Sequence, residues 1–103
     1  MRQSVIHQPR VAWDGALAFV RAAASEYYGV YAAMVFDTLG RDVYTAYEDT
    51  RERIFEAVVR DPLDRTVLDV EAGKWRVRLE DLMRADPDLA GPVQRLAAMA
   101  PRY

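Results

Sequence analysis

The sequence contains no cysteine, which excludes disulfide bonds, thiolate nucleophiles and cysteine-based metal sites. His7 is the only histidine, so a Ser-His-Asp arrangement would have to combine it with Ser4 or Ser25. The glycines are scattered singly and form no phosphate-binding loop. These absences favour a protein that has no cofactor, no metal ion and no catalytic residues, although they do not by themselves exclude an enzyme.

Long hydrophobic runs are also absent. The longest uncharged run, residues 27–36, covers about half of the roughly 20 residues that a membrane-spanning helix needs. The first residues lack the apolar core of a signal peptide. The formal net charge is -2 with both signs mixed along the chain, so no basic patch favours nucleic acid. We therefore expect a cytoplasmic protein that neither crosses a membrane nor binds nucleic acid as its main partner.

The chain has 103 residues, of which 51% are hydrophobic, as expected for one globular domain. Residues 1–12 are predicted to be an N-terminal arm, because Pro9 argues against a helix there. Residues 13–103 are predicted to be a single helical domain. Its first helix would cover residues 15–28, with Asp14 as N-cap and a wide apolar face that must be buried.

The clearest helix signal covers residues 45–60. Apolar residues fall there at spacings of three, four and seven, as one buried stripe requires. The stripe consists of Tyr47, Ile54, Phe55, Val58 and Val59. Asp61-Pro62 ends this helix, because the residue before a proline is pushed out of the α region. The stripe has to pack against the rest of this chain or against another chain.

Residues 27–39 fit a strand by composition and a helix by spacing. A helix is favoured, continuous with the first helix or kinked, because only Gly29 interrupts the pattern. Gly40 is either a break or a point where another helix approaches closely. Without a break at Gly40, one helical arm would run from about residue 14 to residue 60 and would imply an oligomer.

Two further helices complete the predicted fold. Asp64 or Thr66 could cap the third helix, and residues 72–84 are its most periodic part. Asp86-Pro87 stops that helix and starts a last one, which reaches about residue 99. The sequence therefore predicts an all-α protein of about four helices, a small helical bundle that forms oligomers.

Glu48, Glu52 and Glu56 repeat every four residues and therefore share one helix face. Metal binding or acid–base chemistry could use such a row, but no Glu-x-x-His pair accompanies it. The interleaved Arg51 and Arg53 favour a solvated face held by salt bridges.

Lys74, Trp75, Arg76 and Arg78 form the only basic and aromatic cluster. Tryptophan and arginine are enriched at interaction hot spots, so these cations and Arg84 are candidate contacts for an anion or a partner. In the alternative interpretation, Trp75 is a core residue and its basic neighbours point to water.

The tyrosines are the other unusual feature of the composition. Tyrosine suits interfaces, because its ring can be buried while its hydroxyl stays wet, although core packing would explain these residues equally well. The candidate interface residues are Tyr27, Tyr28, Tyr31, Met34, Phe36, Tyr47, Ile54, Phe55, Val58 and Trp75.

The segment from Trp75 to Leu96 reads W-x-x-x-L-x-x-L-M-x-x-D-P-x-L-A-x-x-V-x-x-L. This pattern resembles the tail of small, uncharacterised helical proteins common in actinobacteria. Those proteins are similar to accessory modules found near effector-associated and other conflict-system proteins. The resemblance covers about a quarter of the chain. It implies a helical interaction module and carries over no catalytic residues.

The expected function is non-enzymatic protein–protein interaction, as an adaptor or self-assembly module that forms a homo-oligomer, most simply a dimer. One alternative is a small transcriptional regulator or antitoxin-like protein that binds a partner or DNA through its basic cluster. A second is a small-ligand-binding or enzymatic dimer with a tyrosine-lined pocket that includes Glu26 or Asp37.

Overall fold

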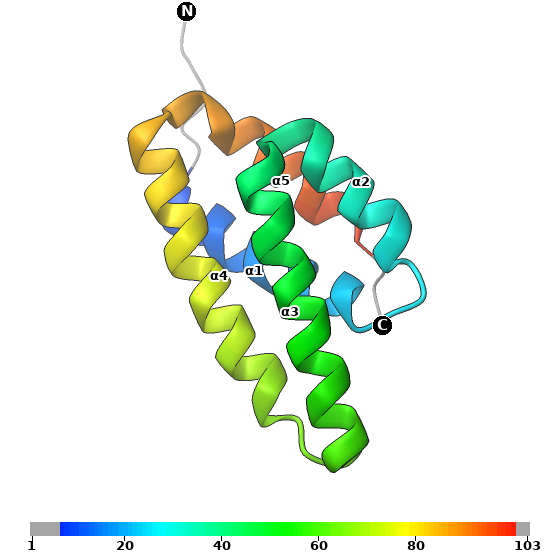
Figure 1. The fold of residues 1–103 in the computed structure, drawn as a ribbon. Coiled ribbons are helices and arrows are strands. Elements are labelled where there is room, and N and C mark those ends of the chain that lie inside the picture. Colours follow the sequence, from blue (N-terminus) through cyan, green and yellow to red (C-terminus); the bar gives the residue numbers. More distant parts are fainter. Residues whose placement is uncertain (1–6, 101–103) are drawn as a thin grey trace, which may run out of the picture.

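The computed structural model describes residues 7–100, and all regular structure in this range is helical (Figure 1). The elements are α1 (Gln8–Ala23), α2 (Tyr28–Leu39), α3 (Arg41–Arg60), α4 (Thr66–Ala85), the short 3-10 helix η1 (Pro87–Leu89) and α5 (Ala90–Met99). The predicted all-α class is confirmed for the described residues, with five α-helices rather than about four. Residues 1–6 of the predicted arm lie outside the described range.

Helix α1 is the centre of the fold. It packs mainly on α4 and α5, while α2 packs on α3. Figure 1 shows α1 behind the long hairpin of α3 and α4. Small side chains cover much of its surface, so other helices approach it closely on several sides. Its buried residues are Val11, Ala12, Gly15, Ala16, Ala18, Phe19, Val20, Ala22 and Ala23. A narrow exposed face remains at Trp13 and Leu17.

Gly15 lies where α1 meets both α4 and α5. A Cβ atom at this position would be 2.9 Å from Leu79 Cδ1 and 3.1 Å from Val93 Cγ1. A separation of 2.9 Å is shorter than ordinary van der Waals contact, so a side chain here would push its neighbours away. Glycine is therefore required at residue 15 for packing rather than for backbone conformation.

The start of α1 differs from the prediction. The helix begins at Gln8, with Pro9 in its first turn, and Asp14 lies in its middle rather than at its N-cap. A proline is tolerated in the first turn because the N–H groups there have no helical partner. The Val11 amide already donates to the His7 carbonyl at 3.0 Å.

The predicted continuity between the first two helices is wrong, because the chain turns between Ala23 and Tyr28. Ser25 holds the turn, since its hydroxyl donates to the Ala22 carbonyl at 2.9 Å and accepts from the Tyr27 amide at 3.0 Å. Arg51 of α3 adds a long-range contact: its Nη1 donates to the carbonyls of Ala23 at 2.7 Å and Ser25 at 2.8 Å. These bonds satisfy carbonyl groups that the end of a helix leaves without partners.

Gly40 breaks the helix between α2 and α3. Its φ of +93° lies in a region that side-chain-bearing residues rarely adopt, so one glycine is enough to reverse the chain. The long continuous arm is therefore absent. The preference for helix over strand at residues 27–39 is confirmed, since α2 covers Tyr28–Leu39.

The predicted end of α3 at Asp61-Pro62 is confirmed, but its predicted stripe is only partly buried. The buried residues of α3 are Val43, Tyr47, Thr50, Ile54 and Ala57, whereas Phe55, Val58 and Val59 are exposed. Arg51 already contacts the end of α1, so the last two turns of α3 extend past that helix. Figure 1 accordingly shows the α3–α4 connection projecting beyond the other helices.

The second half of the fold follows the predicted stop signals. The N-cap of α4 is Arg65 rather than the predicted Asp64 or Thr66, although the Asp64 carboxylate accepts from the Thr66 amide at 2.9 Å just before the helix. Asp86 accepts from the Asp88 amide at 3.1 Å at the start of η1. No helix in residues 7–100 is long and apolar enough to cross a membrane.

Replacing Gly15 by valine tests the close packing of α1. We expect Gly15→Val to lower the free energy of unfolding by about 2 kcal/mol, because the side chain overfills the contact with α4 and α5. The matched control is Gly73→Ala in α4, where an added Cβ meets nothing within 4 Å. That change should raise stability by about 0.5 to 1 kcal/mol through helix propensity alone. Urea denaturation measures both, and equal effects would contradict this account.

Candidate functional site

Four of the predicted interface residues lie inside the core. Tyr31, Tyr47, Ile54 and Trp75 are buried, and they pack with Phe19 in one cluster. The aromatic ring centroids lie 5.0 to 5.6 Å from the Phe19 ring. Their side chains therefore offer no surface to a partner in this fold.

The two buried tyrosine hydroxyls are both used within the chain. Tyr31 donates to the Leu96 carbonyl at 2.6 Å, and Tyr47 donates to the Phe19 carbonyl at 2.7 Å. Burial raises the pKa of both hydroxyls well above 10, because a phenolate would lose its hydration. They are structural groups that hold α2 to α5 and α3 to α1.

A buried polar network joins α3 to α4. Glu71 is only 1% exposed. Its carboxylate accepts from Thr50 Oγ1 at 2.9 Å, from Arg53 Nε at 2.8 Å and from Lys74 Nζ at 3.3 Å. Trp75 Nε1 donates in turn to Thr50 Oγ1 at 2.7 Å. Every polar atom of the network therefore has a partner, as buried groups require.

The pKa of Glu71 supports a structural role for this network. Burial alone would raise the pKa, but hydrogen bonds from Arg53, Thr50 and Lys74 favour the charged form and leave the pKa below its usual 4.5. An acid–base catalyst at neutral pH needs the opposite shift. Glu71 therefore holds the hairpin together as a permanent anion.

The basic cluster is largely neutralised within its own helix. Lys74 contacts Glu71 at 3.3 Å, Arg76 contacts Glu80 at 3.1 Å, and Arg84 contacts Asp81 at 2.7 Å. Of the four predicted cations, Arg78 alone lacks a carboxylate partner, and its guanidinium lies 5.2 Å from the Trp75 ring centroid. Lys74 and Arg53 share the single negative charge of Glu71, so some positive charge remains on this part of the hairpin, together with that of Arg78.

The carboxylate row on α3 is not salt-bridged as predicted. Arg51 binds backbone carbonyls at the end of α1, and Arg53 binds Glu71. Among residues 7–100, no ion pair reaches Glu48, Glu52 or Glu56. The sequence shows arginines next to these glutamates, but in the fold Arg51 binds the end of α1 and the partly exposed Arg53 binds α4.

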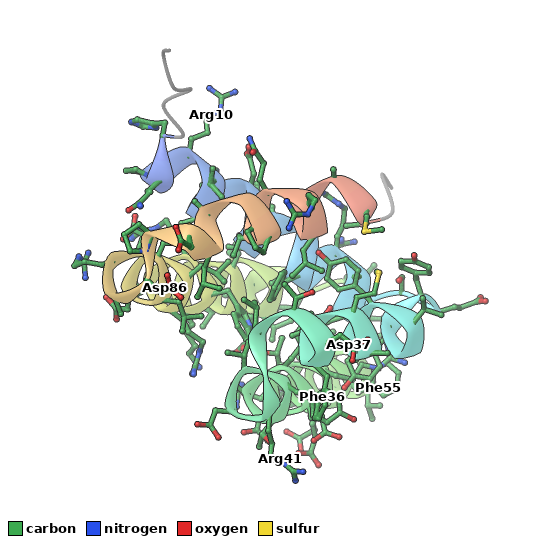
Figure 2. The ribbon with its side chains drawn as sticks, turned by 90° about the horizontal axis from the view of Figure 1, so that it is seen from above. Arg10, Phe36, Asp37, Arg41, Phe55 and Asp86 are labelled. Carbon is green, nitrogen blue, oxygen red and sulfur yellow. The ribbon has the colours of Figure 1, made fainter. Side chains whose placement is uncertain are left out.

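Partly or largely exposed aromatic and apolar residues lie along α2 and α3 in two contacting groups. We call this surface the aromatic strip, and its members are Tyr28, Phe36, Tyr44, Arg51, Phe55, Val58 and Val59. The Arg51 guanidinium lies 4.7 Å from the Tyr28 ring centroid and 4.0 Å from that of Phe55. Phe36 and Tyr44 meet edge to face, with centroids 5.4 Å apart. Figure 2 shows Phe36 and Phe55 on the same side of the molecule.

The strip is open to solvent along its length. Phe36 is 41% exposed, Phe55 is 51% exposed and Val59 is 85% exposed. Leu63, in the connection that follows α3, is 89% exposed and extends the apolar surface to the tip of the hairpin. Large apolar side chains gathered in this way typically mark an interaction surface.

A small apolar pocket of about 230 Å³ lies at the end of the strip. It opens between α3, α4, the connection that joins them and Ala24, the residue that follows α1. Its lining residues are Ala24, Ile54, Phe55, Val58, Pro62, Asp64, Arg65, Val67 and Leu68. Such a pocket can hold one large apolar side chain of a partner, which is how interaction hot spots are commonly built.

Other predicted site residues are dispersed. Met34 and Asp37 line a hollow of about 310 Å³ between α2 and α5, which no tyrosine lines. Tyr27 is half-buried against Tyr31, and Glu26 is exposed in the turn after α1. Within the described range, no group of three or more histidine, aspartate or glutamate side chains could hold a metal ion.

Comparisons with known proteins give no relative from which to transfer a function. No protein-family model matches the sequence, and neither the curated proteins nor the solved structures contain a match. The surface features that distinguish this protein are therefore the aromatic strip, its terminal pocket and the adjacent carboxylate row.

The Glu71 network predicts a specific dependence of stability on acid. Because the folded-state pKa is below the unfolded value, its stabilisation is present above about pH 4.5 and is lost as pH falls through the folded pKa. We expect Glu71→Gln to cost about 2 kcal/mol at neutral pH and to flatten the fall in stability between about pH 5 and pH 3.

Thermal unfolding across this pH range measures the difference. Glu52→Gln is the control, because it removes an exposed carboxylate from α3 that makes no ion pair. If Glu71→Gln retained the full acid dependence of the parent protein, the network would not stabilise the fold.

Proposed function

We propose that this protein is a non-enzymatic interaction module that binds another protein chain through the aromatic strip. The strip combines arginine and aromatic side chains with a terminal apolar pocket, the composition found at binding hot spots. The observation that carries the proposal is the exposure of Phe36, Phe55, Val58 and Val59 along α2 and α3.

The other candidate functions have less support from the surface. The cations proposed to contact DNA have intramolecular partners, apart from Arg78. The buried tyrosines that would line a ligand pocket donate to backbone carbonyls. The exposed residues of the homodimer interface expected from the sequence, Phe36, Phe55 and Val58, all lie in the strip, whereas Tyr27 and Met34 are half-buried outside it.

Site-specific photocrosslinking tests this proposal. A benzophenone side chain placed at residue 55 should form a discrete adduct with a protein in cells that naturally make this chain, because the strip is in contact with its partner there. Mass spectrometry identifies the adduct, including a second copy of the chain.

The matched control position is Val77, which is 49% exposed on the outer face of α4. No adduct is expected from that position. Equal labelling at residues 55 and 77, or no adduct at residue 55, would count against the strip as the docking surface.

A further inference from the structure

This inference rests on the proposed function and names the occupant of the strip. We infer that the strip binds a cationic amphipathic helix of a different protein. The apolar side of that helix would cover the aromatic strip, and its lysine or arginine residues would face Glu48, Glu52 and Glu56. Two independent features support this choice: an exposed apolar surface, and a row of carboxylates beside it that make no ion pair.

The carboxylate row lies directly against the apolar part of the strip. Glu52 precedes Phe55 by three residues, and Glu56 precedes Val59 by three, so each pair is adjacent on the helix surface. Glu48 is close enough to hydrogen-bond with Tyr44, and this bond raises the pKa of the Tyr44 hydroxyl. A partner that covers the rings therefore brings its own edge residues over these carboxylates.

No ion pair within residues 7–100 reaches the row, although the Arg53 charge acts on Glu52 and Asp49 from a distance. Like charges four residues apart on a helix repel each other, and Asp49 adds a fourth exposed carboxylate on the same stretch. Arg53 is exposed but pairs with Glu71, and the remaining exposed arginines of α3, Arg41 and Arg60, lie at its opposite ends. A cationic partner removes this repulsion and gains charge complementarity along the whole contact.

The dimensions of the surface fit one helix. From Tyr44 to Val59 the strip runs along four turns of α3, about 23 Å at the helical rise per residue. A partner helix of about 18 residues spans that length. Apolar residues at spacings of three and four would lie along the strip, with one of them in the pocket beside Phe55 and Val58.

A second copy of this chain fits the strip less well. A two-fold contact places residues near the axis opposite their own copies. With the axis at the middle of α3, Glu48 of one copy would lie opposite Glu52 of the other, and Glu52 opposite Glu48. Like charges brought together at an interface oppose binding, so the row disfavours self-association there.

Two synthetic helical peptides of about 18 residues provide the probe. Both carry leucines at spacings of three and four, and their flanking positions are all lysine in one and all glutamate in the other. The full chain, labelled with ¹⁵N, is titrated with each. We expect the lysine peptide to shift amide signals along α3 around Glu52 and Phe55, and to bind at least about tenfold more tightly than the glutamate peptide.

Charge reversal on α3 locates the binding. Glu52→Lys combined with Glu56→Lys should weaken the lysine peptide by about tenfold or more. Asp14→Lys combined with Asp88→Lys is the control, because it changes the net charge equally at exposed positions on α1 and η1, away from the strip. Circular dichroism confirms that both variants fold. Raising ionic strength from about 0.1 M to about 1 M should weaken binding further, because the Debye length falls from about 10 Å to about 3 Å.

Several results would overturn the inference. Equal binding of the two peptides, no binding of either, or equal loss in the site and control variants would each show that the row does not select a cationic helix. A dimer detected by light scattering and dissociated by Phe55→Glu would identify a second copy as the occupant.

The photocrosslinking result separates this failure from that of the proposed function. An adduct at residue 55 with an acidic partner or a second copy would keep the strip as a docking surface and reject only the cationic helix. The absence of any adduct, together with peptide shifts elsewhere on the chain, would reject both.

Discussion

The burial of α1 on nearly all sides is the constraint on which this structure depends. A helix of alanines with Gly15 at its closest contact lets α4 and α5 pack directly against it, and Phe19 reaches the aromatic cluster under α2 and α3. However, α1 has 16 residues, whereas α3 and α4 have 20 each. The central helix therefore cannot cover the far end of the hairpin, and that end keeps its apolar residues exposed.

The arginines of α3 connect this architecture to the surface chemistry. Arg51 satisfies carbonyls at the end of α1, and Arg53 neutralises the buried Glu71. Both contacts provide hydrogen-bond partners for polar groups inside the protein, where unpaired polar groups are costly. As a result, the glutamates on the outer face of α3 make no ion pair with the arginines that lie next to them in the sequence. The charge pattern at the candidate site is thus a by-product of how the core is satisfied.

Local sequence patterns were enough to predict the fold class and several boundaries. Asp61-Pro62 and Asp86-Pro87 mark real helix ends, because proline disfavours the α region for the residue that precedes it. Local patterns do not predict the turn at Ser25, because Arg51, 26 residues away, helps to stabilise this turn. The start of α1 was missed because Pro9 was treated as a helix breaker, although the first turn tolerates it.

The candidate site was only partly predictable for the same reason. Phe36, Phe55 and Val58 were identified as interface residues and are exposed, but Tyr31, Tyr47 and Trp75 from the same set lie in the core. Helical spacing shows that residues share a face and does not show where the covering helix ends. The pairing of Arg51 and Arg53 with distant groups could not be read from their neighbours in sequence.

Because α1 does not reach the tip of the α3–α4 hairpin, local stability should differ between α1 and that tip. We expect the amide hydrogens in the middle of α1 to exchange most slowly with solvent, because packing encloses them on several sides. Those near the tip, around Val59 and Leu63, have few buried contacts and exchange through local opening. The aromatic strip runs across this boundary, from the rigid α2–α3 junction to the end of the hairpin that opens most easily. A partner bound along its length would therefore slow hydrogen exchange most at the tip.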